Sequence, residues 1–399
     1  MTTIIRAEAA HDFLALVPTL AGFRPERSIV CVAFRGNRTV GVLRHDLPRR
    51  ARDRTTLVST IIGTLCRMPG VDAVVPVVYS DATFAESRGV PERALLGLIA
   101  KRAQQAGFLV RDALCRAADA WASILDPDTP TTGHPLALID ESALVRQAPA
   151  GVEVLASPTA SGELPEPDPK LAAAIAAAIA DFEADDRAEA AITRLGRSAD
   201  PVELVETLVA RDAKHPAIRL AWFVHLASRP PLRDAMMLQF AFGVVVGEAA
   251  HDDAVASAGR ADRHGETMDE LVRREIAEGE ADEVSELLTR LMLGQSTLRP
   301  ERRRVERALT LLRRLIANAP RRLRAGPLCI AAWLAWSLGR GSAAGAFLDL
   351  ALEDEPGHPM ASLLHAFIGS GALPEWAFAG PVRDADPGKA APSSGFSDR

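Results

Sequence analysis

Two pairs of polar residues beside predicted strands have the side chains best suited to binding an anion. Arg44 and Asp46 follow an apolar stretch in the motif R-H-D-L-P, and Arg24 and Ser28 stand just before the preceding strand. A guanidinium presents a planar set of donors that matches a carboxylate or phosphate, and a neighbouring carboxylate can orient it. These four residues are candidates for binding a small anionic ligand. The alternative is an Arg–Asp pair that only holds a hairpin to the turn before it.

The later strands supply further candidates. Tyr79 and Asp81 lie at the end of an apolar run, which is the end where a parallel sheet presents ligand-binding groups, although Ser-Asp is also common at helix entries. Trp121 and Ser123 follow another apolar run. Together with His134 they could line a pocket, or Trp121 could simply anchor the edge of the domain.

Hydrolysis would require a serine, a histidine and an acid that converge. The chain offers these residues for it: Ser28, Ser123, His45, His134, Asp46 and Asp81. It contains no G-x-S-x-G, no G-x-G-x-x-G and no phosphate-binding P-loop. We therefore expect no cofactor. A hydrolase or transferase acting on an anionic substrate, centred on Arg44, Asp46 and Ser123, is kept as an alternative to a protein without enzymatic activity.

Metal binding is not expected either. The stretches 251–253 and 262–266 contain histidines and acids, but no His pair has the i, i+4 spacing of a helical metal site, and both are interpreted as a solvated loop. The four cysteines, in apolar surroundings and without a C-x-x-C pair, are interpreted as free thiols of a cytoplasmic protein. No apolar run approaches the length of a membrane span.

Apolar periodicity predicts the elements that position these residues. In the first half we expect a helix over 7–17 ended by Pro18 and Gly22, and then strands and helices in mixed order. The expected ranges are strands 28–34, 39–43, 73–79, 108–114 and 120–125, and helices 54–68 and 91–106. A hairpin followed by strand–helix–strand units favours a mixed-sheet α/β domain over 1–155, with the hairpin as an antiparallel edge.

The second half is predicted to be entirely helical. A Pro-rich acidic stretch over 156–169 favours a linker, followed by a helical domain over 170–298. The next segment, 299–379, has the small residues and prolines of tetratricopeptide-like helical hairpins, with Pro320 and Pro356 separated by 36 residues. Such hairpins usually bind proteins or peptides. The tail, 380–399, is expected to be disordered.

Charge gives a weak indication of partners. The 399 residues carry a net charge of −6, which is unusual for a nucleic-acid-binding protein. Residues 299–324 nevertheless contain ten arginines and two acids, and 265–286 contain nine acids and two arginines. The basic segment could contact phosphates, although nucleic-acid binding is not favoured. More simply, it could pair with the acidic segment.

The sequence also resembles a family of proteins with a domain of unknown function from high-GC Gram-positive bacteria. The family pattern, P-x-L-x-G-F-x-P-x-x-S-x-V and then R-x-D-L-P, is present from Pro18 to Pro48, and a W-x-S element and a Gly-x-Pro element match further on. The family's cysteine-containing loop is missing at 126–132, so the resemblance implies no metal or disulfide there. It implies membership and no activity. The favoured hypothesis is a ligand- or protein-binding scaffold.

Overall fold

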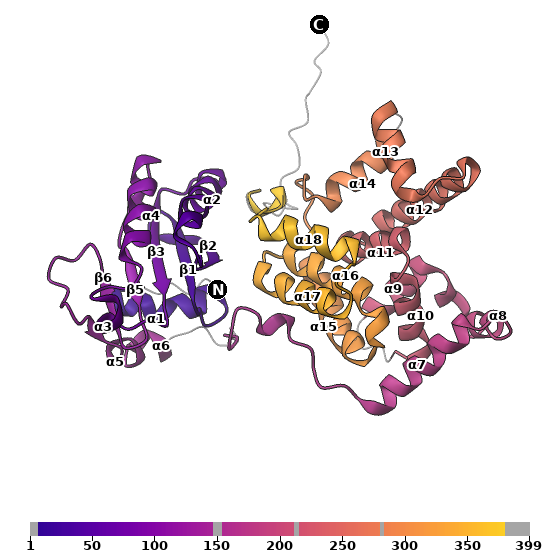
Figure 1. Ribbon diagram of the computed structural model, residues 1–399, viewed down its shortest axis with the longest axis horizontal. Coiled ribbons are helices and arrows are strands. Elements are labelled where there is room, and N and C mark those ends of the chain that lie inside the picture. The colour runs from indigo at the N-terminus through magenta and orange to yellow at the C-terminus, as the bar shows by residue number, and fades with distance from the viewer. Residues whose placement is uncertain (1–6, 147–153, 211–214, 280–282, 380–399) are drawn as a thin grey trace, which may run out of the picture.

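The computed structural model describes residues 7–146, 154–210, 215–279 and 283–379, so the predicted tail at 380–399 lies outside the described residues. An α/β half and a helical half lie side by side (Figure 1). The predicted fold class, a mixed-sheet α/β part followed by an all-α part, is confirmed.

The α/β half alternates strands and helices much as the periodicity predicts. Its helices are α1 (Ala10–Ala21), α2 (Arg54–Arg67), α3 (Phe84–Ser87), α4 (Arg93–Gln105), α5 (Ala137–Asp140) and α6 (Ala143–Arg146). Its strands are β1 (Ser28–Arg35), β2 (Arg38–Asp46), β3 (Ala73–Tyr79), β4 (Leu109–Val110), β5 (Leu114–Arg116), β6 (Ala120–Ser123) and β7 (His134–Pro135).

The strands form one mixed sheet in the order β2-β1-β3-β5-β6-β7, and β4 also pairs with β3. The hairpin β1–β2 forms an edge, as expected, and β1 is antiparallel to β3. Strands β4 and β5 are parallel to β3, as the intervening helix α4 predicts. Because β2 and β3 both run opposite to β1, they point the same way, and their carboxyl ends lie at the same edge of the sheet as that of β5.

Both faces of the sheet are covered by helices. One face packs against α2 and α4 through residues such as Ile29, Cys31 and Ile61. The other packs against α1 through Val30, Val32 and Leu14. Since neighbouring residues of a strand point to opposite faces, this sandwich explains why β1 is apolar throughout.

Three boundaries in this half differ from the prediction. Helix α1 does not stop at Pro18 but continues to Ala21, and it ends at Gly22, which has φ of 79° and donates its N–H to the Pro18 carbonyl at 2.8 Å. Strand β2 continues past Leu43 to Asp46, so Arg44 lies within a strand. The strand expected over 108–114 is divided into β4 and β5 by a turn in which Asp112 accepts from Ser123.

The second half is entirely helical among its described residues. Its helices are α7 (Pro169–Glu183), α8 (Ala188–Thr193), α9 (Pro201–Val209), α10 (Ala217–Ala227), α11 (Pro230–Phe242), α12 (Val244–His264), α13 (Met268–Glu278), α14 (Glu283–Met292), α15 (Arg302–Asn318), α16 (Ala325–Ser337), α17 (Gly341–Asp354) and α18 (Pro359–Gly369).

Helix α16 is the centre of this half. Every one of its residues is buried, and it packs against α10, α11, α15, α17 and α18. A Cβ on Gly326 would clash with the Ala227 carbonyl oxygen, so the glycine allows α16 to approach α10 closely. A single hydrophobic cluster extends from Ile175 to Trp376 and crosses the boundary expected at 298.

One expectation for this half is wrong. The stretches 251–253 and 262–266 are expected in a loop, but the residues up to His264 belong to the long helix α12, whose alanines favour helix. The next two helices, α13 and α14, are separate, because Gly279 adopts a left-handed conformation that ends α13.

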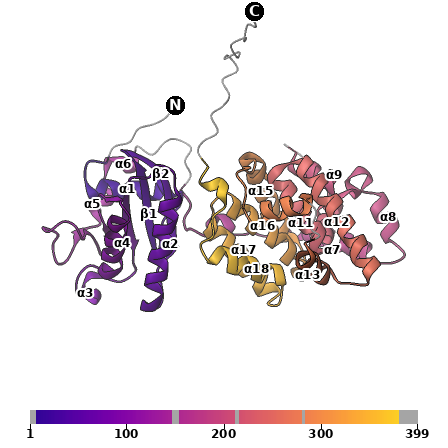
Figure 2. The ribbon, with the colours of Figure 1, turned by 90° about the horizontal axis from the view of Figure 1, so that it is seen from above.

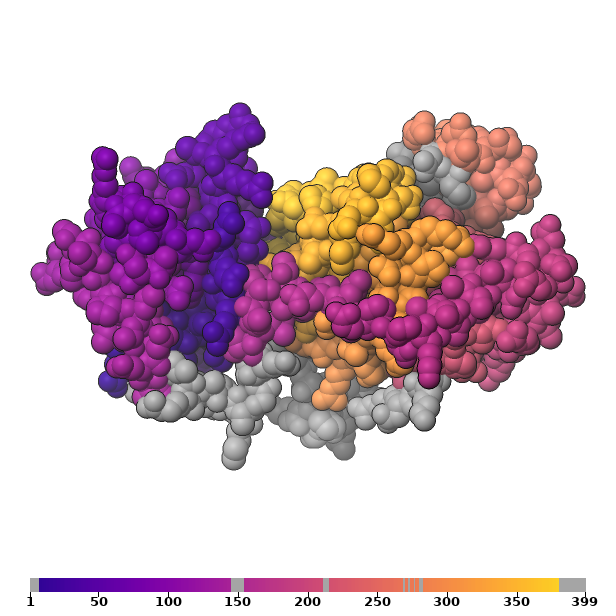
Figure 3. All heavy atoms as spheres, turned by 60° about the horizontal axis from the view of Figure 1, so that its bottom comes forward, coloured from indigo at the N-terminus to yellow at the C-terminus, as the bar shows by residue number. Residues whose placement is uncertain are grey.

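The edge strand β2 and helix α2 face the helical half (Figures 1 and 2). Arg44 donates to the hydroxyl of Ser342 at 3.1 Å, across 298 residues of sequence. Nearby, a Cβ on Gly371 would lie 2.9 Å from the Thr60 methyl group. The segment after residue 154 packs its short helix Ala160–Gly162 against α17, and Figure 3 shows it passing from the α/β half along the helical half.

Candidate functional site

A row of polar and aromatic residues crosses the sheet at the carboxyl ends of β2, β3 and β5. Asp46 pairs with Ser28, Ser28 with Tyr79, and Tyr79 with Arg116. Arg116 in turn pairs with Trp121, and Trp121 with His134. We call these six residues the polar row: Asp46, Ser28, Tyr79, Arg116, Trp121 and His134.

The alternation of side chains places the polar row on the face covered by α1. Val30 and Val77 belong to the cluster that packs against α1, and Ser28 and Tyr79 are two residues away from them on the same strands. Helix α1 brings His11 to within 6.1 Å of Trp121, measured between ring centroids. In open α/β sheets, ligands bind at the carboxyl ends of the strands, and the polar row lies at the carboxyl ends of β2, β3 and β5.

Three polar atoms of the row are buried without a hydrogen-bond partner. They are the Ser28 hydroxyl, the Tyr79 hydroxyl and the Trp121 indole nitrogen, on residues that are 0%, 6% and 5% exposed. An unsatisfied buried polar group costs about 1–3 kcal/mol. Three of them, on β1, β3 and β6 of one face, therefore mark this face as a candidate binding site.

Trp121 differs in this respect from every other tryptophan of the chain. Each of the other four donates its indole N–H to a backbone carbonyl at 2.8–3.0 Å: Trp222 to Ala199, Trp333 to Met292, Trp336 to Ala372 and Trp376 to Ser337. The fold thus satisfies its structural tryptophans internally. The exception lies in the polar row.

Four members of the row, Ser28, Tyr79, Arg116 and Trp121, carry hydrogen-bond donors, whereas Asp46 only accepts and is paired with Arg44. An indole N–H and a guanidinium can only donate, and a neutral phenol donates readily. Burial raises the pKa of Tyr79, and the charge of Arg116 offsets this only in part, so the phenol stays protonated. Arg116 is exposed, and its side chain makes no hydrogen bond or ion pair with the described residues, while its backbone carbonyl accepts from the Ser80 N–H. Donors of this kind are chemically complementary to an acceptor, and the guanidinium is complementary to an anionic one.

Aromatic side chains close one end of the row. The His134 ring stacks on the Trp121 ring at 4.5 Å between centroids and an angle of 29°. The two residues therefore form a flat aromatic wall beside Arg116 in the sheet.

The structure brings together three of the seven predicted site residues and places a fourth beside them. Ser28, Asp46 and Tyr79 belong to the polar row. Arg44 lies two residues before Asp46 on the same face of β2, and its guanidinium forms an ion pair with the Asp46 carboxylate at 2.5 Å. Its guanidinium also reaches Ser342, so Arg44 connects the edge of the row to the helical half.

The other three predicted residues lie elsewhere. Ser123 donates to Asp112 at 2.5 Å and accepts from two backbone N–H groups, so it stabilises a turn at the opposite end of β6. Asp81 forms an exposed ion pair with Arg27 at 3.5 Å. Arg24 is exposed, and its backbone N–H bonds to Leu155.

Sequence reasoning missed Arg116. Its strand has only three residues and follows an irregular turn, so periodicity gives no signal for it. The available signal was an arginine at the carboxyl end of a short apolar stretch.

The proposed convergence of serine, histidine and acid is not found at Ser28 and His45. His45 pairs with Ile29, so its side chain points to the face covered by α2, opposite the polar row. Burial lowers the pKa of His45, and the charge of Arg44 lowers it further. A hydrolytic arrangement based on these two residues is therefore excluded by the register.

Within the described part of the chain, no group of three or more histidine, cysteine or acidic side chains could hold a metal ion. The search of the same residues for a helix long and apolar enough to cross a membrane also finds none.

The arginines of 299–324 are mostly engaged within the helical half. Eight of the ten donate to a carboxylate or a backbone carbonyl. Arg304 is buried and binds both oxygens of Glu206, and Arg322 likewise binds Glu183 with two hydrogen bonds. Most of this basic segment is thus structural.

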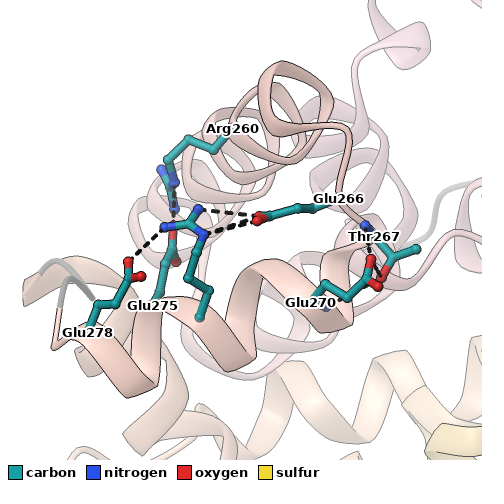
Figure 4. Close-up of polar contacts among 7 residues, drawn as sticks. Arg260, Glu266, Thr267, Glu270, Glu275 and Glu278 are labelled. Carbon is teal, nitrogen blue, oxygen red and sulfur yellow. Dashed lines mark hydrogen bonds and ion pairs between the residues drawn. The ribbon is translucent and has the colours of Figure 1, made fainter.

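The expected pairing of this segment with the acidic residues 265–286 is wrong for the described residues. Three acids in and just before α13 have local partners instead: Arg274 donates to Glu266 and Glu278, and Arg260 donates to Glu275 at 2.8 Å (Figure 4). These hydrogen bonds raise the pKa of Arg274. The acidic stretch folds back on α12, away from α15.

Comparison with known proteins gives a family and nothing more specific. The model of a domain of unknown function (DUF4192) matches residues 11–375, so the chain belongs to this family, as the motif resemblance predicts. No curated protein matches the sequence, and no solved structure matches it.

Proposed function

We propose that this protein binds a small molecule, and that the α/β half binds an oxyanion, a carboxylate or a phosphate, at the polar row. The observation that carries the proposal is the set of unpartnered donors on Ser28, Tyr79 and Trp121 next to the free guanidinium of Arg116.

The spacing of the row suggests the size of the ligand. Neighbouring strands lie about 4.8 Å apart, so the backbones at Ser28 and Trp121 are separated by three such steps, about 14 Å. A single-atom anion would satisfy one donor only. A polycarboxylate or a phosphate ester, with acceptors at both ends, fits the row better.

Binding is favoured over catalysis because the row lacks an activated nucleophile. Its serine is buried, and its one carboxylate, Asp46, is already ion-paired with Arg44. A hydrolase or transferase acting on the same anion remains the alternative proposal, without the role first given to Ser123.

A protein partner on the helical half is a second proposal. Helices α16 and α17 pack as an antiparallel hairpin, as in tetratricopeptide-like repeats, but α16 is enclosed on all sides. A partner would therefore lie on the outer helices, where Leu363 of α18 is 67% exposed. The four free cysteines fit a reducing compartment such as the cytoplasm.

Thermal unfolding with added anions tests the main proposal. We expect citrate and inorganic phosphate to raise the melting temperature of the wild-type protein, with citrate more effective. Arg116→Ala should abolish this effect, whereas Arg38→Ala should retain it, because Arg38 is an exposed arginine at the opposite end of β2. Equal stabilisation of both variants would contradict the proposal.

A further inference from the structure

A hollow lies apart from the polar row, beside the core that packs between the sheet and helices α2 and α4. It lies between the α3–α4 segment and the loop from Ile124 to Thr132, which extends from the edge of the sheet (Figure 1). Its volume is about 940 Å³. Phe84 and Ile124, which line it, belong to the cluster that packs against α2 and α4. The hollow is therefore independent of the site under α1.

An arginine in a strained conformation lines this hollow. Arg88 ends α3 with φ of 53° and ψ of 42°, the left-handed conformation that normally selects glycine. Gly89 follows directly, and a glycine at 88 would relieve the strain. Since strained non-glycine residues cluster at ligand sites, the arginine indicates that a side chain is needed at this position.

Charges of both signs are present on the lining. Arg88 and Arg93 are exposed, and neither side chain has a hydrogen bond or ion pair among the described residues. Asp119 accepts from the Phe84 N–H at 3.1 Å, and Asp126 accepts from the Asp128 N–H at 3.0 Å. Each carboxylate thus has a second oxygen that these bonds do not use.

The rest of the lining includes apolar residues such as Phe84, Leu125 and Pro130, and also Ser87 and three threonines. Leu125 is 46% exposed and offers apolar surface to the hollow. A ligand complementary to this surface has an apolar body, a carboxylate for the arginines and an ammonium group for the aspartates.

We infer that this hollow binds a zwitterionic amino compound with an apolar side chain, either a free amino acid or a short peptide. The carboxylate lies between Arg88 and Arg93, and the ammonium group lies by Asp119 or Asp126. The volume is ample for a few residues of peptide.

Calorimetric titration of the full chain distinguishes these sources. The probes are L-leucine, the tripeptide Ala-Leu-Ala, its N-acetyl form and its C-terminal amide. We expect the tripeptide to bind at one site, and to lose about tenfold in affinity, or about 1.4 kcal/mol, on either modification. If L-leucine binds with an affinity comparable to that of the tripeptide, the ligand is a free amino acid. If L-leucine binds much more weakly than the tripeptide, the ligand is a peptide.

Variants then test the assignment of the arginines. Arg88→Gly should leave the melting temperature unchanged or raise it, because it relieves strain. The double variant Arg88→Gly/Arg93→Ala should lower the affinity for the tripeptide at least tenfold. Its affinity for the C-terminal amide, which already binds more weakly, should not change. Arg102→Ala, on α4 but outside the hollow, is the control and should bind as the wild type does. Absence of saturable binding of all four probes to the wild type, or undiminished binding to the double variant, would overturn the inference.

Discussion

Ser28 and Tyr79 lie directly opposite each other on β1 and β3, and the hydroxyl of each is buried without a partner. The two side chains lie on the same face of the sheet, with their Cβ atoms only about 5 Å apart. Neither hydroxyl has a hydrogen-bond partner among the described residues. Neither hydroxyl therefore helps to hold the sheet together, and both are available to a bound molecule.

Removing one of these hydroxyls should not weaken the fold. When the hydroxyl of a buried tyrosine is hydrogen-bonded, a change to phenylalanine lowers the free energy of unfolding by about 0.5–1.5 kcal/mol. For Tyr79→Phe and Ser28→Ala, we expect the free energy of unfolding in urea to stay the same or to rise by up to about 1 kcal/mol. The citrate-induced rise in melting temperature should fall in both. A loss of stability above about 1 kcal/mol would mean that the hydroxyl already has a partner, such as an ordered water.

The buried Arg304–Glu206 pair connects α15 to α9 and is completed by Gln239, which donates to Glu206 at 2.9 Å. Arg304→Ala leaves a partly buried carboxylate without its charge partner, so we expect a loss of roughly 3 kcal/mol. The adjacent arginine, Arg303, is exposed and has no such partner among the described residues. Arg303→Ala should change the unfolding free energy by less than about 0.5 kcal/mol. Equal effects of the two changes would exclude the structural role assigned to Arg304.

This pair also predicts a pH dependence. Burial raises the pKa of Glu206, but hydrogen bonds from Arg304 and Gln239 outweigh it and hold the pKa below the usual value of 4.5. A carboxyl group whose pKa is lower in the folded state than in the unfolded state stabilises the fold at pH values above its unfolded-state pKa. This stabilisation is lost as the pH falls through the folded-state pKa. The difference in unfolding free energy between wild type and Glu206→Gln should be full at pH 7 and shrink below pH 4.5. A difference that grows on acidification would contradict this sign.

Helix α16 allows a test of close packing with a matched control. Gly326→Ala would force a methyl group against the Ala227 carbonyl, so we expect a loss of about 1–3 kcal/mol in chemical denaturation. Gly345 of α17 has nothing within 4 Å of its Cβ position, and Gly345→Ala should stabilise the helix by up to about 1 kcal/mol. If both changes were neutral, α16 and α10 would not be in close contact.

Arg44 should govern how the two halves sit together. Its change to alanine removes the hydrogen bond to Ser342, while the core of each half is untouched. We expect Arg44→Ala to keep its circular dichroism spectrum and to increase its radius of gyration in small-angle X-ray scattering. An unchanged scattering curve would show that Arg44 is not needed for the contact.

The sequence predicts the fold better than the site, for a physical reason. Apolar runs such as the one from Ile29 to Phe34 determine which face is buried, and turns at Gly22 and Gly279 end helices by local geometry alone. A site depends on register, which local patterns do not contain: Ser28 and Tyr79 are brought together by pairing between distant strands. Ser123 was a reasonable candidate, but its hydroxyl is used by Asp112. Arg116 gains its importance only from its position beside Tyr79.

The indole N–H of Trp121 gives the most direct test of the central claim. In a proton–nitrogen correlation spectrum, its signal can be assigned as the one that disappears in Trp121→Phe. We predict that titration with citrate shifts this signal saturably in the wild type and in Arg38→Ala, and leaves it in place in Arg116→Ala, because the bound anion accepts from Trp121 only when Arg116 holds it there. A Trp121 signal that does not move in the wild type as citrate is added would contradict an anion site at the polar row.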